Sequence, residues 1–118
     1  MAKILIVDDS RTSRKILKSI LTEAGHEIIG EATNGEEAVK MYDELNPDLV
    51  TLDITMPVMD GLSALKIIMT DHPDATVIMV TAAGQKSKMV EAIKEGASEF
   101  IQKPFEPEQI LSVVKTIV

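Results

Sequence analysis

The chain has no cysteine, no excess of basic residues and no long apolar run, and each shortage excludes a class of function. Without cysteine among its 118 residues, the protein cannot form disulfides, thiolate zinc sites or a thiol nucleophile. Its formal net charge of −7 argues against nucleic acid as a direct partner, since phosphate binding needs clustered lysine and arginine. The composition, 45% hydrophobic and 26% charged, is that of a globular protein rather than a disordered one.

The short apolar runs also bear on location and domain number. No apolar stretch approaches the ~20 residues that span a bilayer, so we expect no membrane insertion. The N-terminus passes from Met1-Ala2-Lys3 directly into an expected strand, which argues against a signal peptide and predicts a cytoplasmic protein. The length suits one core, so residues 1–118 are expected to form a single domain.

Most of the apolar residues gather in short runs rich in Val and Ile, typical of buried parallel strands. Strands are predicted at residues 3–7, 27–32, 49–52, 76–80 and 99–101, and helices at about 11–23, 35–45, 61–71, 86–95 and 108–117. This alternation predicts an α/β fold, a doubly wound parallel sheet covered by helices on both faces. The runs at Ile4 and Val77 are the most continuous and should be central, whereas the weaker strand at 27–32 suits an edge.

Polar side chains stand where these strands end. Asp8 and Asp9 follow the first strand, Asp53 the third, Thr81 the fourth and Lys103 the fifth. Because the carboxyl ends of parallel strands meet at one edge, these groups should converge where open α/β sheets bind ligands. Three carboxylates would repel one another unless a hard cation lay among them, and Mg²⁺ prefers such oxygen ligands. An ammonium and a hydroxyl beside them would suit a phosphoryl group.

Each of these residues also has a simpler structural explanation. Asp8-Asp9 could cap the following helix, although one aspartate suffices for that role. Lys103 could be a solvated loop lysine, Thr81 a β-branched strand end and Phe100 a core residue. Asp53 is harder to explain in this way, because it ends a buried strand and begins no helix.

Four segments in order resemble the receiver domain of bacterial response regulators, and the resemblance covers essentially the whole chain. The segments are Ile4-Leu5-Ile6-Val7-Asp8-Asp9, Leu52-Asp53-Ile54-Thr55-Met56-Pro57 with Asp60-Gly61, Val80-Thr81-Ala82 and Lys103-Pro104-Phe105. The resemblance, and not the periodicity, implies a flavodoxin-like (βα)5 fold with strand order 2-1-3-4-5.

The resemblance also implies a role for each residue at the strand ends. Asp53 resembles the phospho-acceptor that takes a phosphoryl group from a histidine kinase. Asp9 and Asp53, with the main-chain carbonyl of Thr55, resemble the Mg²⁺ ligands, while Asp8 resembles an acid that acts mainly through bound water. Lys103 resembles the lysine that contacts Asp53 and then the phosphoryl group.

Thr81 and Phe100 resemble the switch residues of the family. The hydroxyl of Thr81 would be drawn toward the phosphoryl group, leaving space into which the ring of Phe100 can move. Many family members carry tyrosine at the second position. Phenylalanine has no hydroxyl, so only the position of the ring can signal here.

The expected function is therefore that of a stand-alone signalling switch in a two-component pathway, and not of an enzyme beyond its own phosphorylation and dephosphorylation. The chain ends with the last predicted helix, at Val118, and leaves no room for a DNA-binding or enzymatic output domain, so output should come from binding another protein. Residues 30–39 and 53–57 look most like chemotaxis receivers, which bind the flagellar motor switch. We expect a monomer whose partners are a histidine kinase, an output protein and a phosphatase, with neither nucleic acid as a partner nor membrane insertion.

Three alternatives remain open at this point. One is a phosphorelay intermediate that passes its phosphoryl group to a histidine phosphotransfer protein. Another is a metal-dependent phosphatase with an aspartyl-phosphate intermediate, but such enzymes typically carry a second acid where Thr55 stands. A nucleotide-binding domain is weaker still, because no glycine-rich loop follows the first strand.

Overall fold

The computed structural model describes residues 2–82 and 84–117. Its strands are β1 (Lys3–Val7), β2 (Glu27–Ala32), β3 (Leu49–Asp53), β4 (Val77–Thr81) and β5 (Glu99–Gln102). Within these residues all five strands pair in parallel in one sheet, in the order β2-β1-β3-β4-β5. The α/β class, the strand order and the edge position of β2 are thus confirmed. The strands β1 and β4 lie inside the sheet, on either side of β3.

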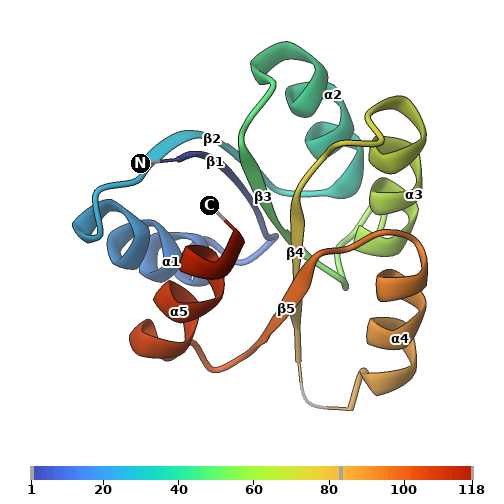
Figure 1. Cartoon of the computed structure of the whole chain (residues 1–118). Helices are drawn as coiled ribbons and strands as arrows, with labels where there is room; N and C mark the ends of the chain where they lie inside the picture. Colours follow the sequence, from blue (N-terminus) through green and yellow to red (C-terminus); the bar gives the residue numbers. More distant parts are fainter. Residues whose placement is uncertain (1, 83, 118) are drawn as a thin grey trace.

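The helices α1 (Arg11–Glu23), α2 (Gly35–Leu45), α3 (Gly61–Asp71), α4 (Lys86–Lys94) and α5 (Pro107–Ile117) cover both faces of the sheet. Helices α1 and α5 lie on one face, and α2, α3 and α4 lie on the other (Figure 1). Three helices start at a residue whose side chain accepts a backbone N–H three positions on, as N-caps do: Ser10, Asn34 and Asp60. Gln85, before α4, makes no such capping hydrogen bond.

Alternate strand residues fill two apolar clusters, one under each layer of helices. In β1, Ile4 and Ile6 pack with residues of α1 and α5, whereas Leu5 and Val7 pack with residues of α2, α3 and α4. Each fully buried aliphatic side chain contributes about 1.5–3 kcal/mol to folding. The hydroxyl of Thr51, in the middle of β3, is buried and has no hydrogen-bond partner within the described residues. No helix in this part of the chain has the length and apolar character needed to cross a membrane.

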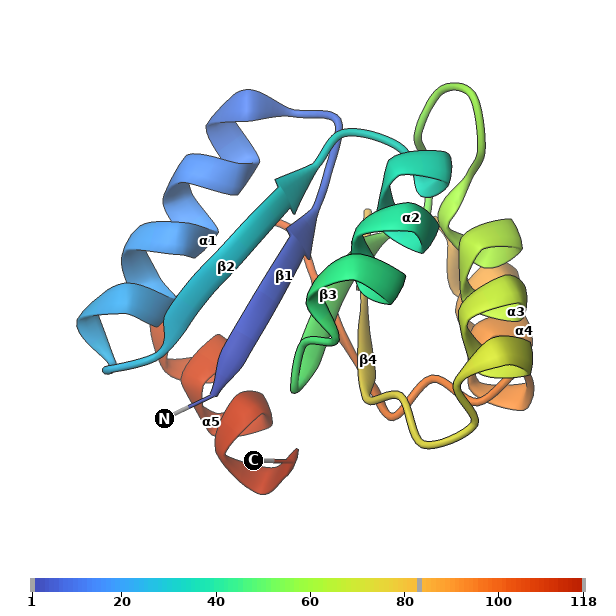
Figure 2. The same ribbon diagram turned by 90° about the horizontal axis from the view of Figure 1, so that it is seen from above.

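The parallel sheet brings the ends of its strands to one edge, as the arrowheads of β1 and β2 show in Figure 2. At that edge β3, β4 and β5 each run one residue beyond the predicted strand. Backbone bonds continue the pairing from Ile54 N–H to the Val80 carbonyl and from Lys103 N–H to the Thr81 carbonyl, and Thr81 pairs with Gln102. The start of α3 lies directly against the end of β3, and a side chain at Gly61 would collide with the Asp53 carbonyl. The chain that follows Asp53 is therefore closely confined.

Candidate functional site

The three carboxylates predicted to converge do meet at this edge. One oxygen from each of Asp8, Asp9 and Asp53 lies within 4.8 Å of the others. Asp8 and Asp53 are buried, with 3% and 6% of their surface exposed, while Asp9 is open to solvent. Burying like charges this close together is costly, so the site needs positive charge to balance them.

Lys103 supplies a positive charge from the end of β5. Its Nζ lies 3.0 Å from Asp8 Oδ2 and 3.6 Å from Asp53 Oδ2. Burial by itself lowers the pKa of Lys103, but the hydrogen bond to Asp8 and the charges of Asp53 and Asp8 outweigh it, and the pKa is raised overall. The ammonium is thus kept charged between the two buried acids. The interpretation of Lys103 as a solvated loop residue is wrong.

The carboxyl of Asp53 is the more strongly perturbed group. Burial, followed by the nearby charge of Asp8, raises its pKa from 3.8 to about 6, although Lys103 acts in the opposite direction. With no metal ion among the acids, the Asp53 carboxyl therefore titrates just below neutral pH. A cation placed among the acids would favour the ionised form, which is the nucleophilic one.

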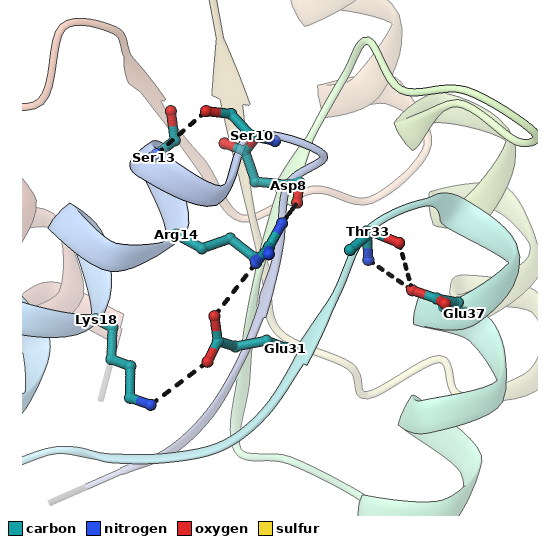
Figure 3. A network of polar contacts seen from close by, with 8 residues as sticks. All are labelled: Asp8, Ser10, Ser13, Arg14, Lys18, Glu31, Thr33 and Glu37. Carbon is teal, nitrogen blue, oxygen red and sulfur yellow. Dashed lines mark hydrogen bonds and ion pairs between the residues drawn. The ribbon is translucent and has the colours of Figure 1, made fainter.

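Asp8 is fixed through both its carboxylate and its main chain. Its Oδ1 accepts a hydrogen bond from the backbone N–H of Ser10 at 2.8 Å, and its carbonyl accepts one from Arg14 Nη1 at 2.8 Å. Arg14 also pairs with Glu31 on β2 through Nε at 3.2 Å, and Lys18 pairs with the same glutamate, as Figure 3 shows. The turn between β1 and α1 is thus tied to the neighbouring strand. Since Ser10 caps α1, capping does not explain the pair of aspartates.

The donor set fits a small hard cation. Mg²⁺ takes oxygen ligands at 2.0–2.1 Å in octahedral geometry, which places opposite ligands about 4 Å apart. Three carboxylates within 4.8 Å of one another reach that arrangement with small movements. Thr55, whose carbonyl the family resemblance adds to the set, lies two residues beyond Asp53 in the loop that leads to α3. The acidic cluster can therefore bind a metal ion.

The two expected switch residues lie next to this site. The hydroxyl of Thr81 is buried and faces the Ile101 carbonyl at 3.5 Å, the outer limit of a hydrogen bond. Phe100 is 38% exposed, so the interpretation of Phe100 as a core residue is wrong. Both residues line a cavity of about 180 Å³ at the start of α4, together with Gln85 and Met89.

Gln85 is a residue of this site that the sequence analysis missed. Its Oε1 accepts a hydrogen bond from the Ala82 N–H at 2.7 Å, and its Nε2 donates to Thr55 Oγ1 at 2.5 Å. It thereby joins the loop after β4 to the loop after β3. A glutamine in a loop belongs to no recognisable motif, and its two partners become apparent only when the loops are placed in space.

The sheet topology and the acidic edge with its lysine define a receiver-type signalling domain. A family model described as the response regulator receiver domain matches residues 4–115, and the chain belongs to that family.

Several relatives of this chain are chemotaxis proteins. The chemotaxis protein CheY of Thermotoga maritima is 50% identical over 115 residues, which are 98% of this chain and 96% of that protein. The CheY of Listeria monocytogenes is 52% identical over 115 residues, which are 98% of this chain and 97% of that protein. A crystal structure of a CheX–CheY–BeF3–Mg²⁺ complex from Borrelia burgdorferi matches with a TM-score of 0.93 and 43% identity, over 98% of this chain and 87% of that one. The protein is thus a receiver closely related to CheY.

Proposed function

We propose that this protein is a phosphorylatable switch of a two-component system and that Asp53 accepts the phosphoryl group from a histidine kinase. The observation that carries the proposal is the position of the Asp53 carboxylate. It lies at the end of a central strand, within reach of two further acids and 3.6 Å from the ammonium of Lys103. A buried nucleophile with positive charge beside it is the arrangement that phosphoryl transfer requires.

In the proposed reaction, an Asp53 oxygen attacks the phosphorus of a phosphohistidine on the kinase. The new P–O bond forms as the P–N bond breaks, and the electron pair leaves with the imidazole nitrogen, giving an acyl phosphate. Lys103 faces the developing charge on the phosphoryl oxygens, and Asp8 holds Lys103 in place at 3.0 Å. Mg²⁺ held by Asp9, Asp53 and the Thr55 carbonyl would neutralise charge on the same oxygens.

The switch is proposed to read the charge of the product. A phosphoryl group adds about −1.5 to −2 charges to a site that is already acidic, and its oxygens need hydrogen-bond donors. The Thr81 hydroxyl is a ready donor, because its bond to the Ile101 carbonyl is long at 3.5 Å. Its movement would make room for the ring of Phe100 beside the cavity at α4. The surface formed by α4, β5 and α5 would then change its affinity for a partner.

The proposed pathway is chemotaxis, with a component of the flagellar motor switch as the output partner and a phosphatase to end the signal. The similarity to CheY proteins over nearly their whole length supports this choice. The Borrelia burgdorferi complex, in which a CheY is bound to CheX with BeF3 and Mg²⁺, supports a protein partner and a metal-assisted phosphoryl site. Thr55 stands where a phosphatase would carry its second acid, so slow self-hydrolysis is proposed rather than rapid turnover.

The test is phosphorylation by acetyl phosphate in the presence of Mg²⁺, read as intact mass. The parent should gain one phosphoryl group and Asp53→Asn none, because asparagine keeps the shape of the side chain but is not a nucleophile. Asp71→Asn, the same substitution at an exposed position, should gain the group as the parent does. Mass gain that persists in Asp53→Asn would move the acceptor to another residue.

A further inference from the structure

The amide of Gln85 joins two loops at the edge of the acidic site. One loop follows β3 and contains Thr55, whose hydroxyl accepts from Gln85 Nε2 at 2.5 Å. The other follows β4 and contains Ala82, whose N–H donates to Gln85 Oε1 at 2.7 Å. We call these two hydrogen bonds the Gln85 bridge. Both contacts are within hydrogen-bonding distance, and the bridge reaches from Gln85 to Thr55, 30 residues earlier in the chain.

The position of Gln85 in the chain makes this use of its side chain unusual. Gln85 stands at the N-cap of α4, where the corresponding side chains of Ser10, Asn34 and Asp60 cap their own helices. The Gln85 side chain makes no capping bond and contacts Ala82 and Thr55 instead. Its main-chain carbonyl still accepts from the Met89 N–H at 3.0 Å, within the first turn of α4. One residue therefore connects the site edge to the start of this helix.

The bridge restrains the segment that must move in the proposed switch. Ala82 directly follows Thr81, and the register that pairs Asp53 with Val80 sets the ends of β3 and β4 side by side. The Thr81 hydroxyl is only weakly engaged, at 3.5 Å, whereas the next residue is anchored by a bond of 2.7 Å. A shift of Thr81 toward a phosphoryl group would carry Ala82 with it and strain this anchor.

We propose that Gln85 is a positioning residue that stabilises the unphosphorylated arrangement of these loops, and that the Gln85 bridge opens when Asp53 is phosphorylated. This inference rests on the proposed function. Opening the bridge frees the first turn of α4 beside the cavity lined by Met89 and Phe100. Part of the free energy gained when the site binds the phosphoryl group is then needed to break the bridge. Only the remainder is available to change the surface at α4.

The test measures beryllofluoride binding by calorimetry in saturating Mg²⁺, with BeF3⁻ standing in for the phosphoryl group on Asp53. Gln85→Met keeps the length of the side chain and removes both hydrogen bonds. Because a hydrogen bond in a protein has a modest net value, the variant should bind beryllofluoride about threefold to tenfold more tightly than the parent. A general disturbance of the site would weaken beryllofluoride binding instead of tightening it.

Two further variants make the test specific to the bridge. Gln102→Met is the matched control, because Gln102 lines the same cavity but belongs to neither hydrogen bond, and its affinity should equal that of the parent. Thr55→Val removes the other end of the bridge and should also tighten beryllofluoride binding. In the double variant Gln85→Met/Thr55→Val, the two gains should not add, since both substitutions break one link.

The outcomes separate this inference from the proposed function. Unchanged or weaker beryllofluoride binding by Gln85→Met, or fully additive gains in the double variant, would overturn the role of the bridge while leaving Asp53 as acceptor. Absence of beryllofluoride binding by the parent would overturn the proposed function itself. If Gln85→Met did not fold, as judged by circular dichroism, Thr55→Val would decide, and parental affinity in that variant would also overturn the bridge.

Discussion

Replacing Asp53 by asparagine should stabilise the metal-free protein at neutral pH. The carboxyl is buried beside Asp8, and its pKa is raised to about 6 from an ordinary 3.8. The folded protein therefore binds the carboxyl proton of Asp53 more tightly than the unfolded chain does. At pH 7 the carboxyl is ionised, so the free energy of folding includes the cost of burying its charge. Asparagine has nearly the same shape and carries no charge, so it removes that cost.

The size of the effect follows from the pKa difference. A difference of about two units, at about 1.4 kcal/mol per unit, makes the variant up to about 3 kcal/mol more stable than the parent. The difference should be fully present above pH 6, shrink as the pH falls through 6, and vanish below about 3.8, where Asp53 is protonated in both states. In a domain of this size, about 3 kcal/mol raises the melting temperature by about 10 °C.

The assay is thermal unfolding followed by circular dichroism in EDTA, at several pH values between 4 and 7.5 (on the order of half-unit steps). Asp71→Asn is the control, because it makes the same charge change at an exposed position. Saturating Mg²⁺ should then stabilise the parent more than Asp53→Asn, which lacks one carboxylate ligand. Equal melting temperatures for parent and Asp53→Asn at pH 7 in EDTA would refute the reasoning, because Lys103 would then compensate the buried charge completely.

Four further predictions concern the metal, the switch, the lifetime and the core. Asp9→Ala should weaken Mg²⁺ binding more than Asp8→Ala, and parental affinity in both by calorimetry would argue against the metal site. Thr81→Ala should still accept a phosphoryl group but lose the gain in partner affinity with beryllofluoride; a full gain would make the hydroxyl purely structural. Thr55→Asn should shorten the half-life of the acyl phosphate, because an amide there can orient water; an equal half-life would show no role for the side chain. Thr51→Val should raise the free energy of unfolding in urea by about 1 kcal/mol, because the buried hydroxyl lacks a partner within the described residues; a lower value would mean that the hydroxyl is satisfied.

Sequence periodicity predicted the elements to within a residue or so at most ends. Helix ends were readable because their signals are local: Ser10 and Asn34 cap the helices that follow them, and Gly25 follows the first helix with a φ of 94°. The ends of β3, β4 and β5 were each predicted one residue short. The pairing that extends them joins different strands, so a local pattern cannot reveal it.

The identity of the site residues was also readable from the chain, since each polar residue stands at the end of an apolar run. Parallel pairing made their convergence a geometric consequence, and the 4.8 Å cluster of Asp8, Asp9 and Asp53 bears it out. The strand order was different. Periodicity shows where strands lie but not which ones are neighbours, so the order came from the family resemblance.

The sequence by itself therefore determined the kinds of element, their order along the chain and the residue types at the strand ends. Only the tertiary structure decided how those residues are partnered. It placed Lys103 nearer to Asp8 than to Asp53, buried Asp53 deeply enough to raise its pKa, and joined Gln85 to Thr55. The physical reason is that periodicity reflects burial within one element, whereas distances between side chains depend on strand register and loop packing.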